Sequence, residues 1–216
     1  MLNVRHVTNN QPFFAGVILL EEGNLVATLN MDGLPSALMK NPAWRVGGVG
    51  GGQKAGETIW ECALREAHEE LCTEVTLRTS QVTYFHDIDT GKITSITCDD
   101  PIAPFLLERQ SNLFPYGPYR PGLPAGPYTY FGLFLAERTR AHMQPGDDVE
   151  ALLHIPCERW SLLQNLPELE EVLRGGARLL ERRPLPRSGR LWLPPHESMS
   201  TVAQLLVQHP ELVRVS

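Results

Sequence analysis

The sequence contains few cysteines, and their spacing matches no common ligand pattern. The four cysteines, at positions 62, 72, 98 and 157, include no C-x-x-C pair and show no short regular spacing. This argues against both a zinc site and a disulfide framework. If Cys62 and Cys72 share one helix, ten residues at about 1.5 Å each hold them roughly 15 Å apart, which is too far for a disulfide. We therefore expect reduced thiols in a cytoplasmic protein, where they serve as small buried or half-buried hydrophobic side chains.

Long apolar runs and an excess of positive charge are also missing. The longest apolar run near the N-terminus, residues 13–20, is far shorter than the about 20 residues that a membrane-spanning helix needs. Acidic residues follow it in place of a small-residue cleavage site, which argues against a signal peptide. With 19 Lys and Arg against 25 Asp and Glu, the chain lacks the positive field of a dedicated duplex-DNA or anionic-membrane binder. We expect neither duplex nucleic acid nor a membrane as a partner.

The composition that remains is that of a globular chain. Its 216 residues are 42% hydrophobic and 20% charged, and a chain of this length buries about 70% of its unfolded surface. We expect a main domain over residues 1–183 and a C-terminal extension over residues 184–216 that packs on the same domain. Prolines and glycines recur in residues 99–127 and predict a long irregular insertion, either a lid or binding loop or a disordered segment.

Hydrophobic patterns predict the order of the other elements. Residues 13–30 are typical of a β-hairpin around a turn at residues 21–24. Residues 31–42 are expected to form a loop, and the glycine run at residues 47–52 a second loop in which no regular element persists. The later elements that we expect are strands within residues 74–85 and 92–98 separated by a loop at 86–91, strands at 128–136 and 149–155, and a helix at 167–183 made imperfect by Gly175 and Gly176.

The pattern over residues 57–71 predicts an amphipathic helix with an acidic face. Its apolar residues recur at spacings of three and four, and they are Ile59, Trp60, Ala63, Leu64, Ala67 and Leu71. At about 100° per residue, Glu66, Glu69 and Glu70 fall within roughly a 100° sector beside this stripe. Carboxylates this close repel one another, and a hard divalent cation would compensate their charge. Oxygen-only ligands suit Mg²⁺ or Mn²⁺ better than zinc.

Two further features accompany the acidic face. The glycine run lies directly upstream of the helix, and its exposed amides and carbonyls suit phosphate and metal contacts. Within the helix, Arg65 is placed either to orient Glu69 or to lean toward Glu57 at the helix start. A glutamate-rich helix alone is commonly a solvated face, so the prediction of a site depends on the loop and the helix together.

Residues 51–73 resemble the Nudix box. Gly51, five residues, Glu57, seven residues and then Arg65-Glu66-Ala67-His68-Glu69-Glu70 keep the spacing of that family's glycine, glutamate and R-E-U-x-E-E core, where U is a bulky aliphatic residue. The sequence departs from the pattern at three positions, because Ala67 is small for the first U, Cys72 replaces the closing glycine and Thr73 replaces the last aliphatic residue. The order of elements on either side is similar to the Nudix fold. The expected fold class is therefore α/β of the α+β type, with a mixed β-sheet sandwiched between helices.

This resemblance implies a hydrolase acting on phosphorus-containing anhydrides, with Mg²⁺ or Mn²⁺ as cofactor. Its substrate would be a nucleoside diphosphate linked to another moiety, cleaved by attack of a metal-activated water on phosphorus. The resemblance implies metal ligation by Glu66, Glu69 and Glu70, a backbone carbonyl from Gly51 or Gly50, and a helix braced by Glu57 and Arg65. The general base is Glu66 in our first hypothesis, and Asp148 or Glu150 in a loop is the alternative.

Residues outside the acidic core are expected to contact the substrate. The substrate-binding residues that we predict are Arg45, Gly50, Gly52, Tyr84 and His86. Tyr84 could stack on a base or pack in the core. His86 precedes Asp87 and Asp89 and could contact a metal or the substrate, or serve no such role. Residues 86–91 carry neither the proline nor the tyrosine that marks some branches of the family, so the sequence does not specify the substrate.

The Cys72 departure concerns the geometry of the helix end. The glycine at this place usually adopts a left-handed conformation, which a residue with a Cβ atom enters at a cost of about 1 kcal/mol or more. We expect that the helix ends differently here. We also expect activity to survive, since all three carboxylates lie upstream.

The sequence also allows functions other than hydrolysis. A Nudix-like module could bind a nucleotide for regulation or assembly with little turnover, although the intact carboxylates argue against it. A further hypothesis is that residues 99–127 and 184–216 form a homodimer interface. The glycine run is neither a dinucleotide fingerprint nor a P-loop, because Gln53 stands where the last glycine is needed and Lys54 lacks its preceding glycine.

Overall fold

The structure is a computed structural model that describes residues 1–118 and 120–210. Its internal contacts divide the chain into two units. The first unit contains Met1–Ile18, Gly50–His68 and Glu74–Thr139, and the second contains Leu19–Val49, Glu69–Thr73 and Arg140–Ser216. Each unit combines distant stretches of sequence, and the domain boundaries expected at residue 183 remain a prediction. Tyr119 of the expected insertion and the last six residues of the expected extension lie outside the described residues.

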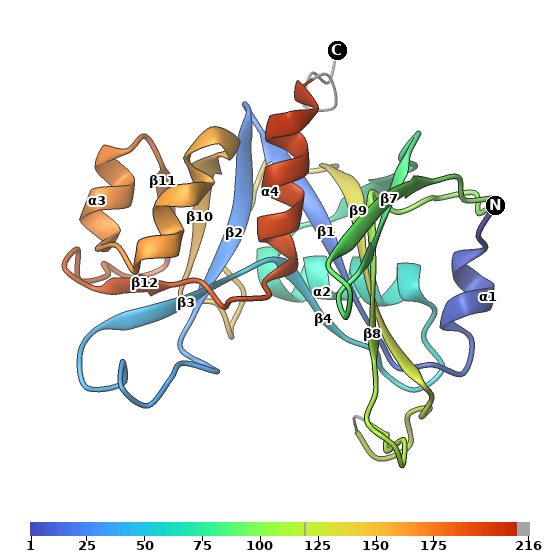
Figure 1. Ribbon diagram of the computed structural model, residues 1–216. Helices are drawn as coiled ribbons and strands as arrows, with labels where there is room; N and C mark the ends of the chain where they lie inside the picture. Colours follow the sequence, from blue (N-terminus) through green and yellow to red (C-terminus); the bar gives the residue numbers. More distant parts are fainter. Residues whose placement is uncertain (119, 211–216) are drawn as a thin grey trace. The chain divides into compact units, whose positions relative to one another are not determined.

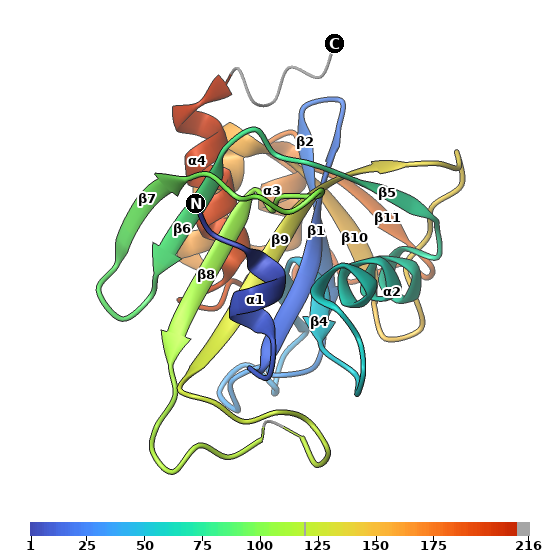
Figure 2. The ribbon, with the colours of Figure 1, turned by 90° about the vertical axis from the view of Figure 1, so that its right-hand side faces the viewer.

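The first unit contains a mixed sheet and two helices (Figure 2). The helices are α1 (Val4–Thr8) and α2 (Ile59–Leu71), of which α2 continues into the second unit from Glu69. The strands are β5 (Val75–Arg78), β6 (Thr83–Asp87), β7 (Lys92–Ile96), β8 (Leu106–Ser111) and β9 (Tyr128–Arg138), with the first residues of β1 (Phe13–Glu21) and the last of β4 (Val49–Gly52). The ring centroids of Trp60 on α2 and Phe134 on β9 lie 6.3 Å apart, so the sheet supports the helix.

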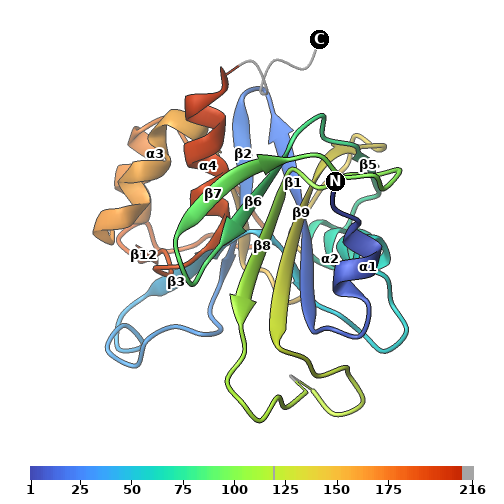
Figure 3. The same cartoon turned by 45° about the vertical axis from the view of Figure 1, so that its right-hand side comes forward.

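Strands β6 to β9 lie side by side in the first unit (Figure 3). Strand β8 runs antiparallel to the first residues of β9 and parallel to β6, and β6 forms an antiparallel hairpin with β7. Strand β5 pairs with the last residues of β9. One parallel pairing among antiparallel ones makes this a mixed sheet.

The second unit also combines strands and helices (Figure 1). Its elements are β2 (Asn24–Asn30), β3 (Ala43–Gly47), β10 (Ala151–Pro156), the 3-10 helix η1 (Cys157–Asn165), α3 (Leu169–Arg174), β11 (Arg178–Glu181), β12 (Arg190–Trp192) and α4 (Ser198–Gln208). Strand β10 pairs antiparallel with β2 and β11, whereas β12 pairs parallel with β3. Helix α4 packs on η1, where the indole N–H of Trp160 donates to Ser200 Oγ at 3.3 Å.

The predicted hairpin and the predicted amphipathic helix are both confirmed. Strands β1 and β2 pair Leu20 with Leu25 across the turn at Glu22 and Gly23, and both turn residues have positive φ. Helix α2 ends at Leu71, as the pattern predicts, and buries most of the apolar stripe. Leu64 is the exception, since it is 40% exposed.

The glycine run differs from the expected loop. Residues 49–52 form strand β4, which pairs with β1. Gly50 explains this result, because a Cβ atom there would lie 2.7 Å from the carbonyl oxygen of Ala15. The low strand propensity of glycine was the reason to expect a loop. In the structure, glycine instead lets two backbones approach closely within a sheet.

Two further expectations are corrected by the structure. The insertion is not irregular throughout, because residues 106–111 form β8, which begins within the apolar run Phe105 to Leu107. The late helix predicted over residues 167–183 is shorter, since α3 ends at Arg174 and the chain returns as β11. Gly175 and Gly176 end the helix rather than weaken it.

The fold class predicted from the sequence is confirmed, since the units combine mixed strand pairing with a few helices. None of the described helices has both the length and the apolar character needed to cross a bilayer.

Candidate active site

Helix α2 carries the acidic residues of the box. Glu66, Glu69 and Glu70 lie at spacings of three and four residues on this one continuous helix, and such spacings place side chains on one helix face. Glu66 and Glu70 are half-buried, and Glu69 is exposed. The opposite, apolar side of the helix is buried through Ile59, Ala63 and Ala67. The helix thus presents a carboxylate face that is fixed by the burial of the other face.

The start of α2 is held by a capping box. Thr58 Oγ1 accepts a hydrogen bond from the Glu61 backbone N–H at 3.3 Å, and Glu61 Oε2 accepts one from the Thr58 backbone N–H at 2.8 Å. The T-x-x-E signal for this arrangement is present in the sequence but was not used in the prediction. It fixes where the helix begins, at Ile59, two residues after Glu57.

Arg65 braces this helix start as the box resemblance predicts. Its Nε donates to Glu57 Oε1 at 2.6 Å and its Nη2 donates to Glu57 Oε2 at 3.0 Å. The same Nη2 donates to the Gly52 carbonyl at 3.0 Å. The hydrogen bond from Arg65 holds the pKa of Glu57 below its usual value, and the same bond raises the pKa of the Arg65 guanidinium. Of the two orientations open in the sequence, Arg65 contacts Glu57.

Arg65 also holds Glu66, the first residue of the acidic core. Its Nη1 lies 2.6 Å from Glu66 Oε1, and the two side chains are 17% and 13% exposed. The carboxylate of Glu66 rests against Gly51, where a Cβ atom would lie 2.5 Å from Glu66 Cδ. The glycine of the box therefore leaves the space that the carboxylate occupies.

Cys62 contacts the same glycine and was not predicted to take part. Its thiol donates a weak hydrogen bond to the Gly51 carbonyl at 3.6 Å. Burial raises the pKa of Cys62 to about 12, so the group stays a neutral donor. Its position three residues before Arg65 on the helix was the signal that could have found it.

The end of α2 does not differ from a glycine-ended helix, contrary to the sequence prediction. Cys72 has φ 46°, which lies in the left-handed region that glycine normally fills at this place. Its Sγ lies 3.9 Å from the carbonyl oxygen of Pro145. The chain therefore adopts the expected glycine geometry with a residue that carries a Cβ atom.

A loop from later in the chain caps the same helix end. The backbone N–H of Gly146 donates to the Glu70 carbonyl at 2.8 Å, and that of Gln144 donates to the Leu71 carbonyl at 3.1 Å. These bonds satisfy carbonyls that a helix end leaves open. The loop continues to Asp148, which is exposed, and to Glu150, which accepts two bonds from Arg183 Nη2 at 2.8 and 3.1 Å. The fold thus brings the loop of the alternative bases to the helix that carries Glu70.

Arg45 is half-buried on β3, and its side chain lies against two glycines, Gly47 and Gly33. A Cβ atom on Gly47 would lie 2.9 Å from Arg45 Nη2, and one on Gly33 would lie 3.7 Å from Arg45 Cδ. On the neighbouring strand, Asn30 pairs with Arg45 and Thr28 pairs with Gly47. No carboxylate forms an ion pair with Arg45 in the part of the chain that the structure describes. Its charge is therefore available to a ligand anion.

Tyr84 and His86 both lie on β6, so His86 belongs to the strand and not to the loop that was expected to begin at residue 86. The Tyr84 ring is mostly buried, with its centroid 5.3 Å from that of Phe105. His86 Nδ1 lies 2.7 Å from Glu108 Oε1, and Glu108 is only 2% exposed. Glu108 was not predicted as a site residue, because it lies within residues 99–127, which were expected to be irregular.

The atoms that α2 and the glycine run offer to a cation are of the kind that bind a hard divalent cation. Glu66, Glu69, Glu70 and the Gly51 carbonyl are all oxygen donors, the type that Mg²⁺ and Mn²⁺ prefer. Within residues 1–118 and 120–210, no three His, Cys, Asp or Glu side chains converge as a ready metal cluster. The space that Gly51 leaves for the Glu66 carboxylate is the structural observation consistent with an oxygen site here.

No protein-family model matches the sequence, and no curated protein matches it. Among solved structures, a Nudix hydrolase from M. smegmatis is similar at 14% identity and a TM-score of 0.46, over 95% of this chain and 89% of that one. A NUDIX family hydrolase from Clostridium perfringens is similar at 16% identity and a TM-score of 0.43, over 76% of this chain and 92% of that one.

A NUDIX hydrolase from Nitrosomonas europaea is similar at 14% identity and a TM-score of 0.37, over 66% of this chain. The match spans 56% of the length of that protein, which is just over half. These similar structures are Nudix hydrolases, and residues 51–73 of this chain resemble the Nudix box.

Proposed function

We propose that this protein is a pyrophosphohydrolase that uses Mg²⁺ or Mn²⁺ to cleave the diphosphate linkage of a nucleoside diphosphate joined to another moiety. The observation that carries the proposal is the contact chain from Glu57 through Arg65 to Glu66 and Gly51. A solvated acidic face would need no such chain. A brace that fixes the first carboxylate of the box beside the box glycine supports a site that must hold its ligands in place.

The cation would be held by Glu66, Glu69 and Glu70, with the Gly51 carbonyl as a further donor. When bound, it would neutralise negative charge on the diphosphate and lower the pKa of a bound water. The protein's own contribution is to orient the carboxylates, because Arg65 fixes Glu66 and the Gly146 amide fixes the backbone of Glu70.

The proton of the attacking water would pass to a carboxylate of this chain. Glu66 is the helix-borne choice, and Asp148 or Glu150 is the choice from the loop that caps α2. Asp148→Asn and Glu150→Gln test the loop choice, since loss of the base lowers kcat even when the substrate still binds. Glu66→Gln also removes a proposed metal ligand, so Glu66 is assigned as the base only if both loop variants keep the kcat of the wild type.

Arg45 would contact a phosphate of the substrate. It is half-buried, and no ion-pair partner is found for it among the described residues. A guanidinium presents paired donors that match phosphate oxygens. Gly50, Gly52, Tyr84 and His86 complete the proposed substrate-binding set, with His86 held by the buried carboxylate of Glu108.

The test is phosphate release from a substrate panel. Nucleoside triphosphates, nucleotide sugars, ADP-ribose, NADH and dinucleoside polyphosphates would be assayed in Mg²⁺ or Mn²⁺, with and without a coupled phosphatase. We expect turnover by the wild type and a loss of about 100-fold in Glu70→Gln. The matched control is Glu170→Gln, which changes an exposed glutamate on α3 and should leave turnover unchanged.

The outcomes separate the two classes of function. Metal-dependent turnover that is lost only in Glu70→Gln supports the hydrolase. If no substrate turns over while a nucleotide still binds, the alternative of a regulatory or assembly module replaces it.

The segments at about residues 99–127 and 184–216 are proposed to mediate a homodimer. A monomeric mass in solution would contradict this. A cytoplasmic location is proposed as well, and it is supported by the four cysteines, which are all free thiols.

A further inference from the structure

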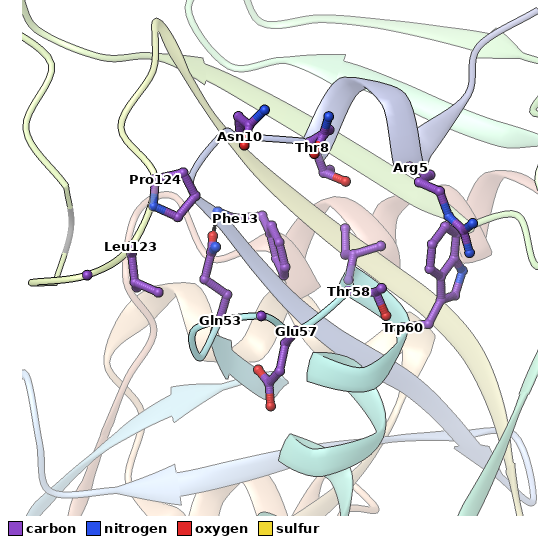
Figure 4. Close-up of a pocket in the computed structure, with 14 residues that line it drawn as sticks. Arg5, Thr8, Asn10, Phe13, Gln53, Glu57, Thr58, Trp60, Leu123 and Pro124 are labelled. Atoms are coloured by element: carbon purple, nitrogen blue, oxygen red, sulfur yellow. Dashed lines mark hydrogen bonds between the residues drawn. The ribbon is translucent and has the colours of Figure 1, made fainter.

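A cavity of about 510 Å³ lies in the first unit, at the start of α2. Its walls come from α1, from the loop before α2, from the first turn of α2 and from residues 122–124 between β8 and β9. A volume of this size suits a small organic molecule. Figure 4 shows Arg5 and Trp60 at one end and Leu123 and Pro124 at the other, with Gln53 and Thr58 between them.

Gln53 contributes an unused donor to this cavity. The residue is only 6% exposed, and its Oε1 accepts a hydrogen bond from the Phe13 backbone N–H at 2.5 Å. That bond fixes which end of the amide is the donor. No acceptor binds its Nε2 group in the part of the chain that the structure describes. An amide donor on a cavity wall is paired only when water or a ligand provides an acceptor.

The positive end of the cavity is formed by Arg5 and the start of α2. The Arg5 guanidinium lies over the Trp60 ring, 5.6 Å from its centroid, and no ion pair to Arg5 is found among the described residues. Ile59 and Trp60 belong to the first turn of the helix, where backbone N–H groups lack helical acceptors and the helix dipole is positive.

The only carboxylate on the cavity wall is already neutralised. Among the described lining residues, Glu57 alone is acidic, and Arg65 occupies both of its oxygens. The opposite end offers apolar surface from the half-buried Leu123 and Pro124. The cavity therefore combines positive charge at the Arg5 end, an amide donor on Gln53 between the two ends, and apolar contacts at the end formed by Leu123 and Pro124.

We propose that this cavity binds a small organic anion, with its phosphate or carboxylate group between Gln53 and Arg5 and its apolar part against Leu123 and Pro124. This site is separate from the acidic face of α2 and does not depend on the proposed hydrolase activity. A neutral molecule of the same shape would leave the positive end without a partner, so charge should decide affinity.

The test is calorimetric titration of the full-length protein with phenyl phosphate, benzoate, benzyl alcohol and inorganic phosphate. Chelator is present throughout, so that no cation links phosphate to the carboxylates of α2. We expect saturable binding of phenyl phosphate or benzoate in the millimolar range or tighter, at least about tenfold stronger than benzyl alcohol or inorganic phosphate. The two anions distinguish a phosphate from a carboxylate ligand.

Variants locate the binding. Gln53→Glu keeps the acceptor for the Phe13 N–H and replaces the donor by an oxygen, so we expect at least about tenfold weaker binding of the anion. Arg5→Met removes a positive charge, so it should weaken binding of the anion and reduce the salt dependence of that binding. Arg5 is exposed, so its loss leaves the core intact. Leu123→Ser should weaken phenyl phosphate but leave inorganic phosphate unchanged.

Matched controls and contrary outcomes complete the design. Leu113→Ser, at a 91% exposed position of the same loop, and Arg174→Met on α3 should leave binding unchanged. Equal affinity for benzyl alcohol and phenyl phosphate would overturn the proposal. It would also be overturned by unchanged binding in both Gln53→Glu and Arg5→Met, or by the absence of saturable binding to a wild-type protein that is folded by circular dichroism.

Discussion

Arg65 holds both carboxylate oxygens of Glu57, with Nε 2.6 Å from Oε1 and Nη2 3.0 Å from Oε2. Both side chains are 17% exposed, so water competes weakly for this pair. The geometry is the two-pronged contact that a guanidinium can make and an ammonium cannot. The remaining nitrogen of the fork is used for Glu66, at 2.6 Å.

The first prediction follows from this contact. Arg65→Lys keeps the charge but loses the second hydrogen bond to Glu57 and the contact to Glu66. We expect the free energy of unfolding to fall by about 2 kcal/mol, measured by urea denaturation. The control is Arg174→Lys, since Arg174 is 73% exposed and its contact to Glu170 spans 3.8 Å. Equal, small changes in both variants would show that the brace contributes nothing to stability.

The second prediction concerns the glycine that faces Glu66. In Gly51→Ala the new methyl group would lie 2.5 Å from the Glu66 carboxylate, which is the movable end of a side chain. We therefore expect a small change in stability, but a displaced carboxylate and about 10- to 100-fold weaker binding of Mn²⁺. Binding can be followed by the relaxation of water protons. Gly117→Ala is the control, because nothing lies within 4 Å of its added methyl group. Unchanged metal binding in Gly51→Ala would contradict the proposed role of Glu66.

The third prediction tests Arg45 through its neighbour. Gly47→Ala would place a methyl group 2.9 Å from Arg45 Nη2 and so move the guanidinium without removing it. If Arg45 contacts a phosphate in both the ground state and the transition state, KM should rise about tenfold with little change in kcat. Steady-state kinetics on the best substrate of the panel provide the measurement. A KM equal to that of the wild type in both Gly47→Ala and Arg45→Gln would exclude this contact.

The fourth prediction concerns the end of the helix. Cys72 adopts φ 46°, so Cys72→Gly should relieve strain at the cost of a more flexible unfolded chain. We expect a net gain in stability of up to about 1 kcal/mol and unchanged turnover, because the three carboxylates lie upstream. Cys72→Ala is the matched control, since it retains the Cβ atom and should gain nothing. A large rise in turnover without a change in stability would show that the cysteine limits activity.

The sequence predicted those parts of the fold that local patterns determine. The spacing of apolar residues along α2 and the turn at Glu22 and Gly23 depend on neighbours within a few residues, and both were predicted correctly. The glycine run was expected to be a loop, because its strand depends on close approach to Ala15, a contact far away in sequence. Strand β8 was missed for the same reason, since its pairing with β6 and β9 outweighs the surrounding prolines.

The candidate site divides in the same way. The spacing of Glu57, Arg65 and Glu66 was readable, and the structure resolved the choice of partner for Arg65 in favour of Glu57. The hydrogen bond from the Gly146 backbone N–H to the Glu70 carbonyl could not be predicted from the sequence, because 75 intervening residues separate the two and only the fold joins them. The left-handed Cys72 was missed because its conformation is imposed by the helix end rather than preferred by the residue.

The fifth prediction concerns the thiols. Burial raises the pKa of Cys62 to about 12 and that of Cys157 to about 11, whereas Cys72 is half-buried at the helix end. Only a thiolate reacts readily with iodoacetamide, so in the native protein the buried Cys62 and Cys157 should be modified last, after the half-buried Cys72 and Cys98. Raising the pH to about 10 should still leave Cys62 and Cys157 largely protonated and protected. Peptide mass spectrometry after labelling gives the order, and labelling in denaturant confirms that all four sites can react. Modification of Cys62 as fast as Cys72 at neutral pH would mean that α2 opens far more readily than its buried face indicates.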